Sequence, residues 1–219
     1  MIDMPGFIRD RSHALSRAEI IWTILRELRE ARYFDQLGKS LDVGSSCGQG
    51  CYALREGGAN PVYGLEPDDE ATIRAVQWGL LDITKVLPAS LEDLPGAYEN
   101  GFFGPEPFDT VTSFMAPFLD VDFGPDRYDD PATKKAAERM VNLLKVLGSL
   151  LPYNETPEEK ISGSLEQMLP VLAPTGRIIL TAGINEAAPR VFDRLGLNYQ
   201  THQLVTRGPE SVAYIVSRR

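Results

Sequence analysis

The sequence contains little cysteine and little histidine. Its 219 residues include two cysteines, Cys47 and Cys51, and two histidines, His13 and His202. Zinc sites in proteins are built mostly from these two residue types, and four of them spread along the chain argue against such a site. We therefore predict no metal. The two cysteines stand at a helical spacing that rarely gives the geometry of a disulfide.

Long apolar runs and an excess of basic residues are also missing. No stretch approaches the ~18 apolar residues that a membrane-spanning helix needs, and the first residues lack the apolar centre of a signal peptide. We expect a cytoplasmic protein without membrane contact. The chain carries 22 Lys and Arg against 31 Asp and Glu, a net charge of −9 at pH 7. Because phosphate contacts need a basic face, this balance disfavours nucleic acid as a partner.

The composition that remains is that of a globular domain. Hydrophobic residues make up 43% of the sequence and charged residues 24%. A chain of 219 residues is long enough to bury a sizeable core and short enough for one domain. We predict a single domain over residues 1–219.

A glycine-rich stretch from Lys39 to Pro67 organises the chain. A short apolar run around Asp42 meets three glycines, and a helical pattern follows as far as Glu56. A second apolar run, Val62–Leu65, then ends on Glu66. This order predicts a strand, a glycine turn, a helix and a second strand with an acid at its tip. Such a unit holds nucleotide-like ligands, because glycines let the backbone approach and the helix start offers free N–H groups.

The spacing of the glycines indicates which ligand fits. Counted from Gly44, the later glycine positions of the dinucleotide fingerprint are occupied by Ser46 and Gln49. A looser match over residues 48–53 starts beyond the point where a pyrophosphate turn should be finished. The acid at Asp42 suits a ligand with an ammonium and a sulfonium group, and it would repel a pyrophosphate.

At this point the sequence resembles the class I S-adenosylmethionine-dependent methyltransferases. Residues 42–48, DVGSSCG, look like their first motif, with Ser46 in place of the commoner middle glycine. Glu66 matches their ribose-binding acid. Residues 89–95 look like their adenine loop, with Ser90 where Asp is common. Segments 108–114 and 172–180 look like their fourth and fifth strands, so the resemblance runs in order from Leu41 to Arg218.

The resemblance implies a fold, a cofactor and a set of contacts. The fold is a Rossmann-like three-layer α/β sandwich with a mostly parallel seven-stranded sheet, ending in an antiparallel hairpin over about 197–205 and 211–216. The cofactor is S-adenosylmethionine. The residues expected to contact it are Asp42, Gly44, Ser46, Gly48, Glu66, Pro67, Ser90, Leu91, Phe114 and Met115.

Periodicity places the remaining elements. Residues 1–38 form an N-terminal helical segment, whose helix is predicted to start at the capping box Ser16–Glu19 and to run to about Tyr33. The third strand is predicted over 83–87, a loop over 96–107, and the fifth strand over 177–181 after a turn at 174–176. Residues 115–172 are longer than one crossover helix requires, and we predict a helical lid there.

The chemistry points to a small-molecule acceptor. Phe114, Met115 and Phe118 suggest an apolar wall at the end of the fourth strand. A base is needed only if the acceptor starts protonated, and the candidates are His13, His202 and Tyr128. Two alternatives stay open: an NAD(P)-dependent oxidoreductase using residues 48–53, and a subunit that binds S-adenosylmethionine without transferring its methyl group.

Overall fold

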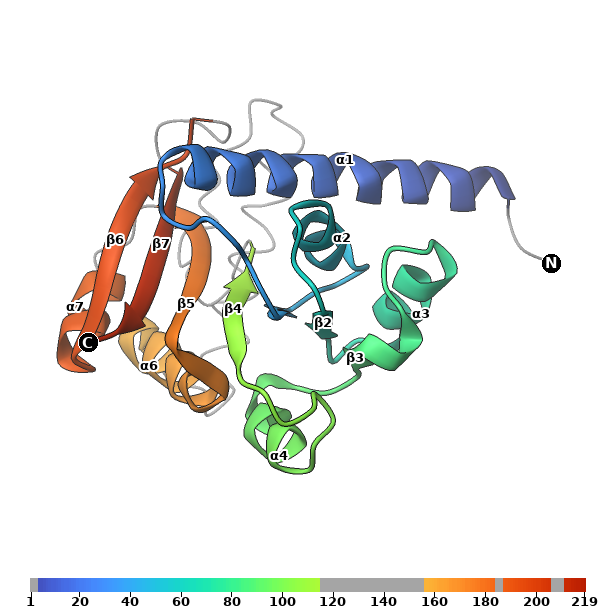
Figure 1. The fold of residues 1–219 in the computed structure, drawn as a ribbon. Helices are drawn as coiled ribbons and strands as arrows, with labels where there is room; N and C mark the ends of the chain where they lie inside the picture. Colours follow the sequence, from blue (N-terminus) through green and yellow to red (C-terminus); the bar gives the residue numbers. More distant parts are fainter. Residues whose placement is uncertain (1–3, 115–155, 184–186, 206–210) are drawn as a thin grey trace.

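A seven-stranded sheet forms the centre of the computed structural model, which describes residues 4–114, 156–183, 187–205 and 211–219. The strand order is β3-β2-β1-β4-β5-β7-β6 (Figure 1). The first five strands are parallel: β1 (Ser40–Val43), β2 (Val62–Leu65), β3 (Val86–Leu87), β4 (Phe108–Ser113) and β5 (Leu172–Gly183). The hairpin of β6 (Leu197–Gln203) and β7 (Ser211–Arg218) places β7 antiparallel to β5. The predicted sheet and its terminal hairpin are confirmed.

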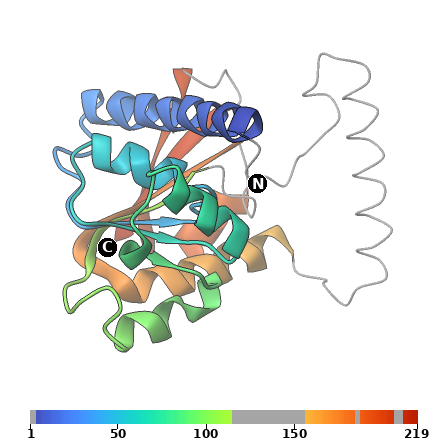
Figure 2. The ribbon, with the colours of Figure 1, turned by 90° about the vertical axis from the view of Figure 1, so that its right-hand side faces the viewer.

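Helices cover both faces of this sheet (Figure 2). One face carries α1 (Met4–Glu30), α2 (Gln49–Glu56) and α3 (Asp69–Gln77); the other carries α4 (Leu94–Glu99), α6 (Pro157–Met168) and α7 (Ala187–Arg194). Leu41 and Val43 of β1 belong to the core cluster on the side of α4, α6 and α7. Because side chains alternate along a strand, Asp42 faces α2 instead. The predicted three-layer sandwich is confirmed.

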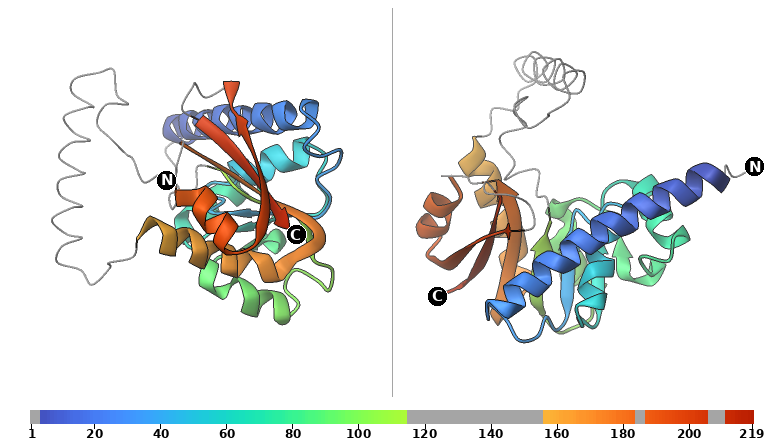
Figure 3. Two further views of the ribbon diagram at one scale, coloured as in Figure 1. Left: turned by 90° about the vertical axis from the view of Figure 1, so that its left-hand side faces the viewer. Right: turned by 90° about the horizontal axis from the view of Figure 1, so that it is seen from above.

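The N-terminal helix is longer than the sequence predicts. α1 begins at Met4, and the Ser16 hydroxyl donates to Ser12 O at 3.1 Å within the helix, so the predicted start at Ser16 is wrong. Buried Ala14, which packs with Trp78 and Leu80, continues the apolar side of the helix beyond that point. α1 runs across the carboxyl-end side of β4 and lies beside α2 (Figures 1 and 3). Among the described residues, no helix combines the length and the apolar character needed to cross a membrane.

Several predicted boundaries need correction. Residues Ile83–Lys85 form a 3-10 helix rather than a strand, because the Asp82 carboxylate accepts from both Thr84 N and Thr84 Oγ1 at 2.9 Å. β5 starts at Leu172, so the turn predicted at 174–176 lies inside a strand. The loop predicted over 96–107 is in part helix, since α4 extends to Glu99.

The described part of the crossover from β4 to β5 contains the helix α6. α6 starts at Pro157 with a capping box, in which Thr156 Oγ1 accepts from Glu159 N at 3.2 Å. Its residues Ile161, Leu165 and Met168 are fully buried in the core. Residues 115–155, which hold Met115, Phe118 and Tyr128, lie outside the described residues. The lid stays a prediction for that segment.

Candidate functional site

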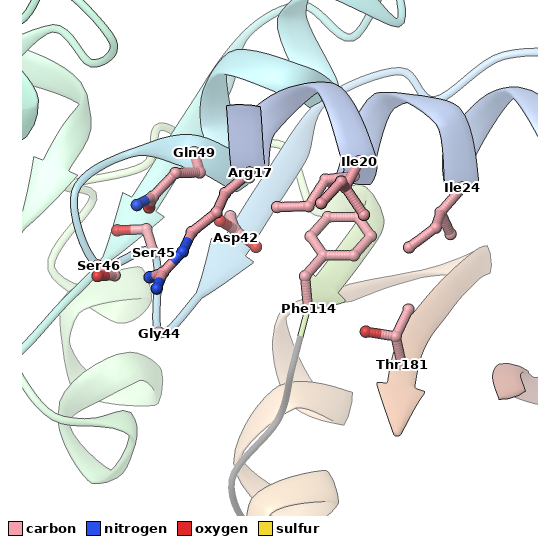
Figure 4. Close-up of a pocket in the computed structure, with 12 residues that line it drawn as sticks. Arg17, Ile20, Ile24, Asp42, Gly44, Ser45, Ser46, Gln49, Phe114 and Thr181 are labelled. Atoms are coloured by element: carbon pink, nitrogen blue, oxygen red, sulfur yellow. The ribbon is translucent and has the colours of Figure 1, made fainter. Parts of the chain in front are cut away.

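A cavity of about 380 Å³ lies between the glycine turn and α1 (Figure 4). It sits where the strand order reverses, beside the carboxyl ends of β1 and β4, the position at which open α/β sheets bind ligands. Its lining comes from the end of β1 and the glycine turn that follows, from α1 and α2, and from the ends of β4 and β5. The lining residues are Arg17, Ile20, Ile21, Ile24, Asp42, Gly44, Ser45, Ser46, Gln49, Gly50, Phe114 and Thr181.

The glycine turn is held in a left-handed backbone conformation. Gly44 has φ +70° and Gly48, the residue before α2, has φ +82°. Ser46 has φ +48°, which is uncommon for a residue other than glycine, at the position where the resembling motif has its middle glycine. Gly44 N and Ser45 N donate to Leu65 O at 2.9 and 3.1 Å, so the turn is fastened to the end of β2.

Glu66 fixes this turn through its carboxylate. Oε2 accepts from Ser46 N at 2.6 Å and Oε1 accepts from Asp68 N at 3.0 Å. The side chain is 8% exposed at the tip of β2. A second acceptor site on each oxygen remains, because an ionised carboxylate offers about four lone-pair positions. The carboxylate is thus held rigidly beside the turn with capacity for a ligand.

Asp42 is a buried carboxyl group on the floor of the cavity. Its Oδ1 accepts from Thr112 Oγ1 at 2.9 Å, and its Oδ2 lies 4.0 Å from Cys51 Sγ. Burial raises the pKa of Asp42 to about 7; the Thr112 hydrogen bond lowers it and the charge of Glu66 raises it. α2 can approach this group because residue 50 is glycine: a Cβ there would lie 2.0 Å from Oδ2.

The other half of the cavity is apolar and comes largely from α1. Ile20 lies against Phe114, and Ile24 and Thr181 stand beyond them (Figure 4). The α1 residues that line the cavity were not predicted as site residues. Helical spacing relates Arg17 to Ile20 and Ile21, and these to Ile24, so the pattern identifies one side of the helix. The pattern does not say what that side contacts.

The remaining predicted cofactor residues lie around the cavity rather than in its lining. Gly48 precedes α2, and Pro67 is exposed after Glu66. The Ser90 hydroxyl donates to Asp93 Oδ2 at 2.9 Å in a capping box, so its side chain serves its own 3-10 helix. Leu91 is half-buried and packs on the core.

The two described base candidates do not line the cavity. His13 is on an exposed side of α1. His202 of β6 has Nε2 2.9 Å from Glu27 Oε1, and its ring meets Tyr33 edge-on at 5.3 Å between centroids. Neither position tests whether the residue acts as a base, so the assignment of a base stays a prediction.

Comparison with known proteins gives the fold. No protein-family model matches the sequence, and no curated protein matches it. A TehB-like SAM-dependent methyltransferase from Corynebacterium glutamicum is 16% identical, with 89% of this chain and 87% of that chain covered and a TM-score of 0.53. Magnesium protoporphyrin IX methyltransferase from Synechocystis, with bound SAM, is 15% identical over 100% and 86%, with a TM-score of 0.55.

A third similar structure is that of a protein named as a methylase of a ribosomal protein. The ribosomal protein L11 methylase from Lactobacillus delbrueckii subsp. bulgaricus is 13% identical, with 91% of this chain and 77% of that chain covered and a TM-score of 0.54. The chain therefore has the fold of S-adenosylmethionine-dependent methyltransferases.

Proposed function

We propose that the protein is a methyltransferase that binds S-adenosylmethionine on the glycine turn and methylates a small organic molecule. The observation that carries the proposal is the divided cavity. One half is the glycine turn with the Asp42 carboxyl group beside it, and the other half is an apolar chamber around Phe114. Glu66 lies outside the lining and holds the turn through Ser46 N. The site lies at the point of the sheet where such ligands bind.

The residues on the turn fit the cofactor. Asp42 offers a carboxylate toward the cationic amino-acid end, and Gly44, Ser46 and Gly48 shape the backbone around it. A Cβ on Gly44 would meet nothing within 4 Å, so the backbone here faces open space that a ligand can fill. We assign Glu66 to the ribose hydroxyls. Toward the adenine and the methyl group we assign Pro67, Ser90, Leu91, Phe114 and Met115.

Methyl transfer asks the protein mainly for alignment. The bound cofactor supplies a methyl group on a sulfonium sulfur. Holding a nucleophile in the right direction about 3–3.5 Å from the methyl carbon accounts for most of the rate that a protein needs to provide. Ile20, Ile24 and Phe114 would orient the acceptor and exclude water from this half of the cavity.

The cavity favours a small organic acceptor. Its apolar half is bounded by α1 on one side and by β4 and β5 on the other, which suits a compact apolar body. The fold leaves the acceptor open, since the similar structures include a porphyrin methyltransferase and a ribosomal protein methylase. The net charge of −9 weighs against nucleic acid.

Particular residues count against one alternative and in favour of the other. A dinucleotide on residues 48–53 would bring its pyrophosphate to the first turn of α2, where Gly50 packs against the buried Asp42 carboxyl group. A subunit that binds the cofactor without transfer is favoured by the positions of His13 and His202, neither of which lines the cavity.

Binding and transfer test the proposal in two steps. Calorimetry with S-adenosylhomocysteine and with NADH should give binding of the first only; binding of NADH alone would reject the proposal. Labelled S-adenosylmethionine is then supplied with fractionated cell extract. Label should pass to the small-molecule fraction. Transfer to protein or RNA would overturn the acceptor class, and binding without transfer to any fraction would favour the non-catalytic alternative.

A further inference from the structure

Arg17 has an unusual position for a residue of an N-terminal helix. It is exposed on α1, and it lines the cavity that the glycine turn forms. Among the described residues of that lining, it is the single positively charged side chain. Figure 4 shows it extending from α1 past Asp42 toward Ser45 and Gly44, away from Thr181 in the apolar half. The guanidinium therefore serves the same half of the cavity as the glycine turn.

We infer that Arg17 binds the carboxylate of the amino-acid end of the cofactor, so that α1 completes the cofactor site. The inference rests on the proposed function. That end of S-adenosylmethionine carries an ammonium and a carboxylate on the same carbon. The cavity presents charges in the matching arrangement: the Asp42 carboxyl group on the floor, and the Arg17 guanidinium reaching in from the opposite side. A guanidinium fork pairs with a carboxylate through two parallel hydrogen bonds.

The helix that carries Arg17 is anchored on both sides of it. Toward the N-terminus, Arg11 Nε donates to Trp78 O at 3.2 Å. Toward the C-terminus, Glu27 Oε1 accepts from Val205 N at 3.0 Å, and Arg29 donates to Gly57 O. The backbone at residue 17 is thus fixed above the turn before any ligand arrives, which reduces the ordering that binding requires.

A pair of ligands separates this role from a general structural one. S-adenosylhomocysteine has the amino-acid end, and 5′-methylthioadenosine has the same adenosine and sulfur without it. We expect Arg17→Gln to raise the Kd of S-adenosylhomocysteine about 10- to 100-fold and to leave the Kd of 5′-methylthioadenosine within about twofold. Arg17→Lys should fall between, because it keeps the charge and loses the fork. Isothermal calorimetry measures each value without any turnover.

A matched control lies on the same helix. Arg26 is an exposed cation that pairs with Glu30 at 3.9 Å and does not line the cavity. Arg26→Gln should leave both dissociation constants unchanged, and circular dichroism checks that each variant is folded. If Arg17→Gln does not fold, Arg17→Lys carries the test.

Each of the other possible outcomes rejects either this inference or the proposed function. Equal weakening of both ligands by Arg17→Gln would mean that Arg17 supports α1 rather than the cofactor carboxylate. Unchanged binding of S-adenosylhomocysteine would place Arg17 outside the cofactor site. Both results reject this inference and leave the methyltransferase proposal standing. Failure of the unaltered protein to bind either ligand would reject the proposed function itself.

Discussion

Asp42 is a residue whose ionisation is controlled by its burial in the fold. Its carboxyl group is 2% exposed, and burial raises its pKa from 3.8 to about 7. In the unfolded chain it titrates near 3.9. Between about pH 4 and pH 7 the folded protein therefore holds a proton that the unfolded chain releases. The free energy of unfolding should fall as the pH rises through this window, by up to about 4 kcal/mol from this group.

Substitution isolates the contribution of Asp42. Asp42→Asn keeps an oxygen that can accept from Thr112 and removes the titration. Urea unfolding at pH 5, 6, 7 and 8 should show the variant gaining stability over the unaltered protein as the pH rises. Parallel stability curves for the two proteins would contradict the raised pKa.

Glu66 should contribute to both cofactor affinity and stability. Glu66→Ala removes the assigned ribose acceptor, and we expect S-adenosylhomocysteine to bind more weakly by about 1.5–3 kcal/mol. It also leaves Ser46 N and Asp68 N without their acceptor, so the turn keeps only its backbone bonds to Leu65 O among those described above. Calorimetry measures the affinity. The control is Glu70→Ala, which removes the same charge from an exposed pair with Arg74; equal affinity of the two variants would reject the assignment.

At the scale of the element, the position of α2 against β1 depends on the absence of a Cβ at Gly50. Gly50→Ala would place a Cβ 2.0 Å from a buried Asp42 oxygen, so we expect a loss of about 1–3 kcal/mol in stability. Gly96→Ala in α4 is the matched control, because a Cβ there meets nothing within 4 Å. It should stabilise the protein by about 0.4–1 kcal/mol. Thermal unfolding of both variants gives the comparison, and a Gly50→Ala protein as stable as Gly96→Ala would show that α2 can shift.

The docking of α1 should depend on Glu27. Its Oε1 is the acceptor for Val205 N and the partner of His202 Nε2, and its side chain is 19% exposed. We expect Glu27→Ala to lower the free energy of unfolding by about 1–3 kcal/mol, because the partly buried His202 ring and Val205 N both lose their charged partner. Glu30→Ala, which breaks an exposed pair on the same helix, should change it by less than about 0.5 kcal/mol. Urea denaturation distinguishes the two, and equal losses would mean that Glu27 does not anchor the helix.

At the scale of the whole molecule, the sheet and the glycine turn were predictable from the sequence. Local patterns determine them: apolar runs specify the strands, Asp68 caps α3 by accepting from Glu70 N at 2.9 Å, and Thr156 caps the start of α6. The part played by α1 was not predictable in the same way. Periodicity identifies a helix, whereas its placement over the cavity depends on contacts with distant segments.

Errors at the level of single elements have a local cause. Residues 83–85 have the composition of a strand, and the Asp82 side chain diverts them into a 3-10 turn. Pro174 and Gly176 are typical turn residues, yet β5 passes through them at a point where its register with β4 shifts. In each case a side-chain bond or a sheet irregularity outweighs the propensity of the segment.

The contacts that anchor α1 also form in a definite order during synthesis of the chain. Glu27 meets partners that stand 175 and 178 positions further along the chain, close to its carboxyl end. A growing chain can therefore place α1 beside α2 and bond Arg11 to Trp78 O early, while the contact of Glu27 with β6 has to wait. The part of the sheet formed by β1, β2 and β4 can also assemble before this. The segment of α1 that carries Arg17 is thus held first from its N-terminal side, and its C-terminal anchor at Glu27 forms only after residues 197–205 have been translated.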